Sequence, residues 1–563
     1  MVAQRKPSRQ RWAPVALCVI GVSIAAAAAP TVSDWLMAGF DLHNTRHQPN
    51  ETILGPDTVG GLKIKWVARL GGSVSATPAV DATSVYVPDW RTWWLSPHGG
   101  KLYRIDRGTG RIIWARRVSD YTGIAGDFSR TTPIVSGDRL ILGNQAGRLL
   151  WPGVPGTVAQ VVSVDKATGN LVWATKVDDN PASIVTSSPV AHDGVVYVGV
   201  SSQEERHAAF IPGYVCCTFR GSVVALDEAT GAILWKTYTV PTDAGGEPLP
   251  GYSGNAVWGS SPVVDVERNS LYVGTGNNYR LPKPVSDCIA GAGDDEDQIR
   301  ACDPAVGIDD DGDNYFDSVL ALDLDDGSIK WGRRFRPYDE WVASCLLPVL
   351  LNPNNCSKRP GVDYDFAQGP ALLDGILGIG QKSGDYWGLD PETGAVVWHA
   401  KVGPGGLYGG MEWGSATDGD RIYVGVANFP TLAPWTLLDG RTVWTGFWAA
   451  LDAPTGEVLW QTPSLHIGGA QGGITVANGV IYAGSHGPTV FAPHRWLFRG
   501  PTMLALDAVT GEVLWDFETV GSVIGAPAVV DGVVYWGAGF ESLGLVLGEQ
   551  PDNKLYAFGL PDE

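Results

Sequence analysis

A short acidic stretch has the residue types and the spacing of a cation-binding loop. In DDDGDNYFD, Asp309, Asp311, Asp313 and Asp317 occupy positions one, three, five and nine, and Gly312 allows a sharp bend. Carboxylate oxygens at alternate positions of a tight loop can wrap a hard cation such as Ca²⁺. The spacing predicts a structural calcium site, with an acidic solvated loop as the alternative.

A second set of polar and aromatic residues precedes apolar, strand-like runs along the chain. It comprises Ser75, Arg130, Thr186, Trp258, Asp365, Glu412, Trp413 and Gln471. If those strands surround one axis, the set forms a ring of mixed charge and aromatic surface that could bind a flat, polar, anionic ligand. Water or a peptide is the alternative occupant of such a channel mouth.

The elements that must position these residues follow from a repeat. Seven segments combine an apolar run, an Asp-x-x-(Thr/Asp)-Gly turn and a second apolar run closed by tryptophan. They end at Trp114, Trp173, Trp235, Trp331, Trp398, Trp460 and Trp515. Because the Asp and Thr side chains can bond the turn backbone and Gly accepts a positive φ, each segment predicts a β-hairpin. We expect the tryptophan to pack between neighbouring sheets.

A second hairpin pattern alternates with the first and occurs eight times, as in SATPAVDATSVYV and IGAPAVVDGVVYWG. The missing eighth outer hairpin can be assembled from KLYAFGL at 554–560 and GLKIKWVARL at 61–70, with Trp66 in the tryptophan position. Pairing the two ends closes a ring and removes free strand edges. The sequence therefore predicts an all-β fold, a single eight-bladed β-propeller with W-motif-like repeats over residues 30–563.

Long insertions fall mostly between the second and third strands of the predicted blades, which places them on one face. DWRTWWLSPHGG, SSQEERHAAFIPGYVCC and FPTLAPWTLLDGRTVWTG are examples. Binding and catalytic residues concentrate on such elaborated loops, so we expect the functional face there. Its tryptophans could contact a long apolar-polar chain; they are Trp90, Trp93, Trp94, Trp435, Trp444 and Trp496.

Charge and the N-terminus bound the partners and the compartment. The formal net charge of −20 repels phosphate backbones and anionic lipid, so we expect no nucleic-acid partner and no membrane-surface partner. Basic residues at 5–11 precede an apolar stretch at 13–29, which predicts a signal peptide over residues 1–29 and a periplasmic or secreted protein. An uncleaved membrane anchor is the alternative; after cleavage we expect no stable membrane insertion.

Six cysteines remain after the predicted signal peptide, an even number that favours disulfides in an exported chain. Pairing Cys288 with Cys302 and Cys345 with Cys356 closes two local loops. The adjacent Cys216 and Cys217 are then left to pair with each other.

Several motifs resemble the pyrroloquinoline quinone (PQQ) dependent quinoprotein alcohol dehydrogenases. CCTFRGSVVALD, GQKSG and GGMEWG are similar to the polyvinyl alcohol dehydrogenase branch of that family. The resemblance covers nearly the whole mature chain. It implies PQQ and Ca²⁺ as cofactors and the oxidation of secondary or polymeric alcohols by hydride transfer to the quinone. Because the chain has no C-x-x-C-H motif for a covalently bound haem, the resemblance implies an external electron acceptor, such as a soluble cytochrome c.

The resemblance also assigns roles to residues. Glu205 in SSQEE and Asn277 in LYVGTGNNY match the family's calcium ligands, and Trp258 in AVWGSSP matches the tryptophan beneath the quinone. Lys382 in GQKSG matches the basic residue that polarises the reactive carbonyl, and Thr186 falls at a position that hydrogen-bonds the cofactor. Further cofactor contacts are expected at Arg130, Cys216, Cys217, Glu412 and Trp413.

The catalytic aspartate is displaced relative to the family pattern. Relatives carry it soon after P-x-D-E, where RPYDEWVASC here has Val342. A cysteine-bearing insertion follows, and DYDFAQGP then restores the pattern with Asp365, which we expect to be the base and the third calcium ligand. Asp339 and Glu340 are the alternatives.

Two features depart from the better-known relatives. Their adjacent-cysteine disulfide lies one blade earlier than Cys216 and Cys217, so we expect this pair to help cover the cofactor or shape its entrance. Ser75 stands where the family has an acidic residue.

The rival interpretations are a non-catalytic binding scaffold, similar to the propeller of outer-membrane protein assembly, and a polysaccharide-binding or lyase propeller.

Overall fold

The structure is a computed structural model. It describes Met1 and residues 34–91, 99–145, 158–259, 261–308, 311–346, 352–429, 433–464, 469–486, 500–540 and 551–561. Residues 33–563 form one compact unit. The predicted signal peptide (apart from Met1), Asp309 and three of the tryptophans (Trp93, Trp94 and Trp496) lie outside the described residues. No helix in the described part of the chain is long and apolar enough to span a bilayer.

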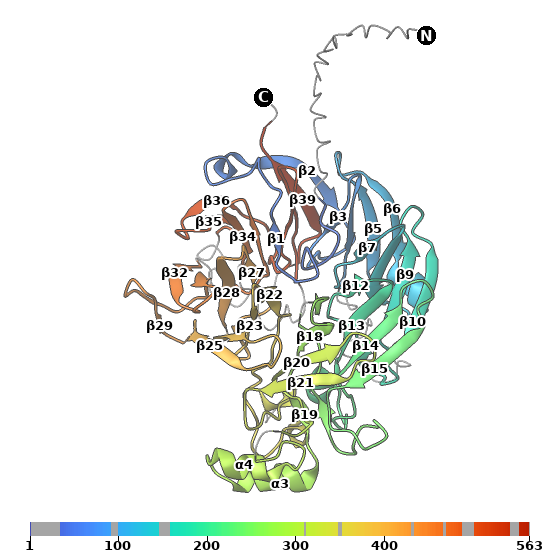
Figure 1. The fold of residues 1–563 in the computed structure, drawn as a ribbon, viewed down its shortest axis with the longest axis vertical. Helices are drawn as coiled ribbons and strands as arrows, with labels where there is room; N and C mark the ends of the chain where they lie inside the picture. Colours follow the sequence, from blue (N-terminus) through green and yellow to red (C-terminus); the bar gives the residue numbers. More distant parts are fainter. Residues whose placement is uncertain are drawn as a thin grey trace. The chain divides into compact units, whose positions relative to one another are not determined.

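Eight four-stranded antiparallel sheets form the blades of the ring, as the sequence predicts (Figure 1). The strands are given from the innermost outward. Blade 1 comprises β3 (Ala79–Val80), β4 (Ser84–Pro88), β5 (Lys101–Asp106) and β6 (Ile112–Arg117), and blade 2 comprises β7 (Ile134–Ser136), β8 (Arg139–Gly143), β9 (Gln160–Asp165) and β10 (Leu171–Lys176). Blade 3 comprises β12 (Val190–His192), β13 (Val195–Ser202), β14 (Ser222–Asp227) and β15 (Ile233–Tyr238), and blade 4 comprises β17 (Val263–Asp265), β18 (Ser270–Gly274), β20 (Ser318–Asp323) and β21 (Ile329–Arg334).

The remaining blades follow the same order. Blade 5 comprises β22 (Ala371–Leu373), β23 (Ile376–Gly380), β24 (Asp385–Leu389) and β25 (Val396–Lys401), and blade 6 comprises β27 (Ala416–Thr417), β28 (Arg421–Phe429), β31 (Phe447–Asp452) and β32 (Val458–Pro463). Blade 7 comprises β33 (Ile474–Ala477), β34 (Val480–Gly484), β35 (Met503–Asp507) and β36 (Val513–Phe517), and blade 8 comprises β37 (Ala528–Val530), β38 (Val533–Gly537), β39 (Lys554–Gly559) and β2 (Lys63–Arg69). Blade 8 combines both ends of the unit, because β2 pairs with β39 (Figure 1). The predicted ring closure is confirmed.

The repeated turn and its tryptophan join each blade to the next. In blade 2, Asp165 Oδ1 accepts hydrogen bonds from the backbone N–H and the hydroxyl of Thr168, and Gly169 has φ 72°. Trp114 of blade 1 donates its Nε1–H to the Lys166 carbonyl at 3.2 Å, and a Cβ added at Gly169 would lie 3.0 Å from its ring. Glycine is needed there for the backbone conformation and also for the close approach of the tryptophan.

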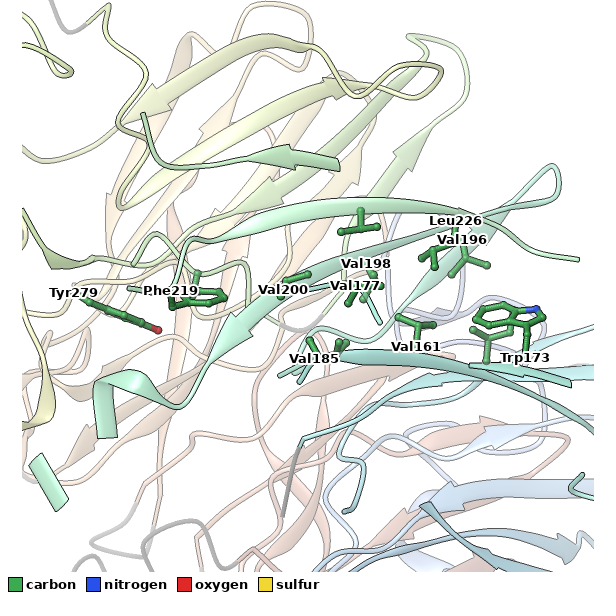
Figure 2. Packing of buried hydrophobic residues seen from close by; sticks show 14 of the residues in the cluster. Val161, Trp173, Val177, Val185, Val196, Val198, Val200, Phe219, Leu226 and Tyr279 are labelled. Carbon is green, nitrogen blue, oxygen red and sulfur yellow. The ribbon is translucent and has the colours of Figure 1, made fainter. Parts of the chain in front are cut away.

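Apolar side chains between neighbouring blades form the core. The cluster between blades 2 and 3 runs from Trp173 to Phe219 and Tyr279 (Figure 2). Cys216 belongs to the same cluster, and Trp258 packs against it. The cluster therefore connects the ordinary blade core to residues expected at the functional face.

The segment at 35–48 crosses the ring and bonds to the innermost strands of seven blades. Its partners include Val80, Val135, Val264, Leu372, Thr417, Val476 and Val529. Within it, β1 (His47–Gln48) adds to β33 as a parallel strand. These bonds fix the segment against the inner strands around the channel.

The insertions carry the helices and the short strands. They contain α1 (Val118–Thr122), α2 (Glu204–Phe210), α3 (Lys283–Gly291), α4 (Glu296–Cys302), β11 (Ser183–Ile184), β16 (Ser253–Gly254), β19 (Asn278–Arg280), β26 (Tyr408–Gly410), β29 (Trp435–Thr436) and β30 (Thr442–Val443). Three 3₁₀ turns are η1 (Val59–Gly61), η2 (Ala343–Cys345) and η3 (Pro353–Asn355). The three predicted disulfides, Cys216–Cys217, Cys288–Cys302 and Cys345–Cys356, are present.

Candidate active site

Residues of blades 3, 4 and 5 meet around Asp365. Trp258 and Asp365 precede innermost strands, whereas Asn277 and Lys382 follow second strands. A second strand ends on the face where an innermost strand begins, so this topology gathers them. Asp365 is only 3% exposed, and it accepts hydrogen bonds from Asn277 N at 2.8 Å and from Trp258 Nε1 at 2.9 Å.

Lys382 lies between two carboxylates. Its Nζ is 2.9 Å from Asp363 Oδ2 and 3.5 Å from Asp365 Oδ2, and both ion pairs are buried. Burial alone would lower the pKa of Lys382, but the charges of Asp363 and Asp365 prevail and raise it well above its usual value. The site therefore contains a permanent cation, 5.5 Å from the centre of the Trp258 ring.

Asp363 is a residue that the sequence interpretation missed. It is 1% exposed, it has φ 62°, and its Oδ1 has no hydrogen-bond partner among the described residues. Burial raises its pKa well above the usual value, against the lowering effect of Lys382. The signal in the sequence was the alternation Asp-Tyr-Asp, which places a second carboxylate two residues before Asp365.

Asn277 presents an oxygen with no partner. Its Nδ2 donates to the carbonyls of Asn278 at 2.9 Å and Trp341 at 2.7 Å, which fixes the orientation of the amide. Its Oδ1 is buried and accepts no hydrogen bond from the described residues. A buried acceptor left without a donor is costly, and a cation would satisfy it.

The two adjacent glutamates at the start of α2 differ in role. Glu204 is 1% exposed and accepts hydrogen bonds from Tyr214 Oη at 2.7 Å, Thr218 N at 2.8 Å and Phe219 N at 2.6 Å, so it anchors the loop that carries Cys216 and Cys217. Glu205 interacts electrostatically with Asp365 and Lys382 instead. Burial raises the pKa of Glu205, Lys382 lowers it and Asp365 raises it further.

The described parts of the disulfide insertion, 343–346 and 352–358, lie against α2 and the loop that follows it. Asn355 Nδ2 donates to the carbonyls of Ala208 and Tyr214, and its Oδ1 accepts from Cys216 N at 3.2 Å. Cys216 is 3% exposed, and both it and Cys217 belong to the apolar surroundings against which Trp258 packs. The adjacent pair and the predicted cofactor tryptophan thus contact the same apolar cluster.

The two alternative candidates for the catalytic base, Asp339 and Glu340, bond to backbone and hydroxyl groups of the surrounding loops. Asp339 is fully buried and accepts from the backbone N–H groups of Asp363 and Tyr364, so it holds the segment that leads to Asp365. Glu340 accepts from Leu281 N and the Ser286 hydroxyl beside α3, and Val342 is buried in the apolar core.

The other predicted cofactor contacts lie across the channel. Arg130 stacks on Trp90, Trp413 and Phe540, with its guanidinium 5.0, 5.3 and 4.7 Å from the ring centres. Trp413 also meets Trp258 edge to face, at 5.6 Å and 72°. Trp90 is 2% exposed, so the expectation that it belongs to an open aromatic rim is wrong: its ring is needed to pack Arg130.

Hydrogen bonds hold three more of the predicted channel residues. Thr186 Oγ1 accepts from Gln145 Nε2 at 2.7 Å. Glu412 accepts from Gln471 Nε2 at 2.7 Å. Of the predicted rim tryptophans that are described, Trp444 is 58% exposed and Trp435 is half-buried.

The acidic loop is described only in part, so the predicted calcium site stays a prediction. Asp311 is exposed, Asp313 accepts from Thr242 N, and Asp317 is fully buried beside Asp339. Asp309 is outside the described residues. Within the described ranges, no three Asp, Glu, His or Cys side chains are grouped as a metal cage. At Asp365, the amide oxygen of Asn277 would supplement the carboxylates of Asp365 and Glu205 as a cation ligand.

Comparison with known proteins identifies relatives of the chain. A family model described as outer membrane protein assembly factor BamB matches residues 57–212 and 448–558. A polyvinylalcohol dehydrogenase from Sphingopyxis sp. (strain 113P3) is 30% identical, over 89% of this chain and 72% of that protein. A quinohemoprotein alcohol dehydrogenase from Comamonas testosteroni is 24% identical, over 99% of this chain and 80% of that protein.

Solved structures agree in fold. The crystal structure of quinohemoprotein alcohol dehydrogenase from Comamonas testosteroni superposes with a TM-score of 0.64 at 21% identity, covering 96% of this chain and 82% of the other. A europium-containing methanol dehydrogenase gives a TM-score of 0.57 at 18% identity, covering 94% of this chain and 98% of the other. At these identities the likeness concerns the fold.

Proposed function

Because the chain belongs to the family of PQQ-dependent quinoprotein alcohol dehydrogenases, which includes the polyvinyl alcohol dehydrogenases, we propose that it oxidises secondary or polymeric alcohols at the Asp365 site with PQQ and Ca²⁺. The observation that carries the proposal is the joint placement of a buried carboxylate, a buried cation and an aromatic ring. Asp365 contacts both Lys382 and Trp258.

The residues present fit the two cofactors. The orphaned Asn277 Oδ1, with Glu205 and Asp365, offers the hard oxygen ligands that Ca²⁺ prefers. Trp258 offers an aromatic face for a planar quinone, and Lys382 lies near that face. Arg130 and Thr186 would hold the anionic part of the quinone.

Asp365 is placed to act as the general base. As a carboxylate it would take the hydroxyl proton of the alcohol, while Asn277 N and Trp258 Nε1 keep it oriented. When bound, the quinone supplies the acceptor for the hydride of the alcohol carbon, and Ca²⁺ makes it more electrophilic. Lys382 remains protonated in this set and would stabilise negative charge that develops beside it.

Two further parts of the proposal follow from the sequence. Electrons would pass to an external acceptor such as a cytochrome c. The basic and apolar N-terminal residues favour export to the periplasm or beyond.

A non-catalytic scaffold is the alternative, and the match to the assembly-factor model is its support. That match covers the repeats at 57–212 and 448–558 and omits Trp258, Asn277, Asp365 and Lys382. A scaffold gains nothing from burying a lysine between two carboxylates beside an orphaned amide oxygen. The site therefore favours the enzyme.

The test is reconstitution of the purified protein. Titration with PQQ in the presence of Ca²⁺ should saturate at one quinone per chain by absorbance, and dye-linked oxidation of secondary alcohols or polyvinyl alcohol should follow. Asp365→Asn should lower turnover on the order of 10²–10⁴-fold while the quinone still binds. Asp439→Asn, at an exposed aspartate, is the control and should leave turnover unchanged.

Absence of quinone binding would refute the proposal. Unchanged turnover in Asp365→Asn would assign the base to another residue, with Asp363 as the first candidate.

A further inference from the structure

A cavity of about 50 Å³ lies on the channel between the segment at 35–48 and the inner strands. Two arginines, Arg46 and Arg130, line it together with serine and threonine residues and Trp413. None of the described residues that line it is an Asp or Glu. The lining is therefore locally positive, although the chain as a whole has 60 acidic and 40 basic residues.

The guanidinium of Arg46 has no counter-charge in the described structure. Arg46 is 2% exposed, and no described residue accepts a hydrogen bond from its side chain. Its Nε is sealed from solvent, so its remaining N–H groups are those that reach the cavity. Burial lowers the pKa of Arg46 to about 10, and no carboxylate offsets this effect.

The chain holds Arg46 in place. Its backbone N–H donates to the Gly39 carbonyl at 2.9 Å, and its carbonyl accepts from Val476 N at 3.0 Å. A Cβ added at Gly414 would lie 2.5 Å from Arg46 Nε, so the backbone packs directly on the guanidinium. A buried cation that is fixed and unpaired is costly unless a ligand compensates it.

Hydroxyl groups complete the lining. Ser75 Oγ accepts from Trp90 Nε1, Thr186 Oγ1 accepts from Gln145 Nε2, and Ser188 Oγ accepts from a backbone N–H. Because each oxygen already accepts a bond, each hydroxyl proton remains available to donate. The cavity thus combines guanidinium groups with hydroxyl donors, which is the chemistry that binds oxyanions.

We propose that this cavity is an anion-binding site, in which Arg46 and Arg130 hold an oxyanion or a carboxylate. A water molecule needs roughly 10–15 Å³ by the same kind of measure, so the space admits one small tetrahedral anion or one carboxylate with water. Two sources share this chemistry: a free inorganic anion, and a carboxylate group of the quinone cofactor. The second source rests on the proposed function.

Phosphate and bromide are suitable probes for the full-length mature protein purified without PQQ. Thermal unfolding is followed against phosphate concentration, with ionic strength held by a bulky sulfonate that cannot enter the cavity. The midpoint should rise and saturate, because a ligand that binds only the folded state stabilises it. Crystals soaked in bromide should give an anomalous peak beside the Arg46 guanidinium.

Arg46→Gln keeps hydrogen-bonding groups and removes the charge. It should raise the half-saturating phosphate concentration at least about tenfold. In phosphate-free buffer it should be no less stable than the wild type. Arg334→Gln is the matched control, since Arg334 is also buried but donates to the carbonyls of Asn314 and Gly312. It should lower the midpoint and keep the phosphate response.

A second arm adds PQQ to distinguish the sources. Displacement of bromide by PQQ identifies the cofactor's carboxylate as the ligand, and retention identifies an inorganic anion that is bound beside it. Quinone binding is measured separately by absorbance. If PQQ fails to bind while bromide occupies the cavity, the proposed function fails and the anion site stands. No bromide peak together with no saturable phosphate response, or a full response in Arg46→Gln, overturns the anion site.

Discussion

The adjacent glutamates of α2 allow one residue to serve as the control for the other. Glu204→Gln keeps a single acceptor oxygen where the carboxylate accepts bonds from Tyr214, Thr218 and Phe219. Losing about two charge-assisted hydrogen bonds should lower the free energy of unfolding by about 2–4 kcal/mol. From the entropy of unfolding per residue, a chain of this size shifts its midpoint by about 1 °C per kcal/mol, so we expect a fall of about 2–4 °C.

Glu205→Gln should leave the stability almost unchanged and weaken Ca²⁺ binding instead. Burial and the nearby charge of Asp365 both disfavour the Glu205 carboxylate. Replacing it should therefore change the thermal unfolding midpoint of the metal-free protein by less than about 1 °C. The affinity for Ca²⁺ in the presence of PQQ should fall at least about tenfold, because a charged ligand is removed. Scanning fluorimetry and calorimetric Ca²⁺ titration measure the two effects. The reasoning is refuted if Glu205→Gln destabilises the protein as much as Glu204→Gln does and leaves Ca²⁺ binding intact.

Three further predictions concern the surroundings of Asp365. Burial and the carboxyl of Asp339 raise the pKa of Asp317 well above its usual value, so the folded state keeps a proton that the unfolded chain releases above about pH 4. The free energy of unfolding should therefore fall by about 1.4 kcal/mol per pH unit above that point until Asp317 ionises. Asp317→Asn should remove this slope in urea titrations at pH 5 and 7, and an equal slope in both proteins would count against a protonated Asp317 in the folded state. In Gly276→Ala the new Cβ would lie 3.0 Å from Asp365 Cγ, so kcat should fall at least about tenfold with little change in stability; a wild-type kcat would show that Asp365 tolerates the shift. Trp258→Phe removes the 2.9 Å hydrogen bond to Asp365 but keeps an aromatic face, so kcat should fall about tenfold while quinone absorbance titration still saturates; an unchanged kcat would exclude an orienting role for the bond.

The ring was predictable because its information is local. The turn at Asp165, Thr168 and Gly169 folds from its own residues, and the same pattern recurs along the chain. The closure between β2 and β39 followed from one missing hairpin. Strand order then placed Trp258 and Asp365 on one face without any knowledge of side-chain contacts.

Roles that depend on long-range packing were not predictable. Nothing in SSQEE says which glutamate anchors the neighbouring loop, since Glu204 and Glu205 differ only in direction on a short helix. The pairing of Asp363 with Lys382 required the cysteine-bearing insertion to return the chain to the channel. Arg46 has no sequence signal, because its burial results from a segment that crosses seven blades.

The most direct test of the active-site account is an anomalous difference map from crystals of the protein grown with PQQ and Ca²⁺. The account predicts a cation peak bonded to Asn277 Oδ1, Glu205 and Asp365, next to a quinone stacked on Trp258. A quinone or cation bound elsewhere, or an Asn277 Oδ1 that remains without a ligand in the occupied protein, would contradict it.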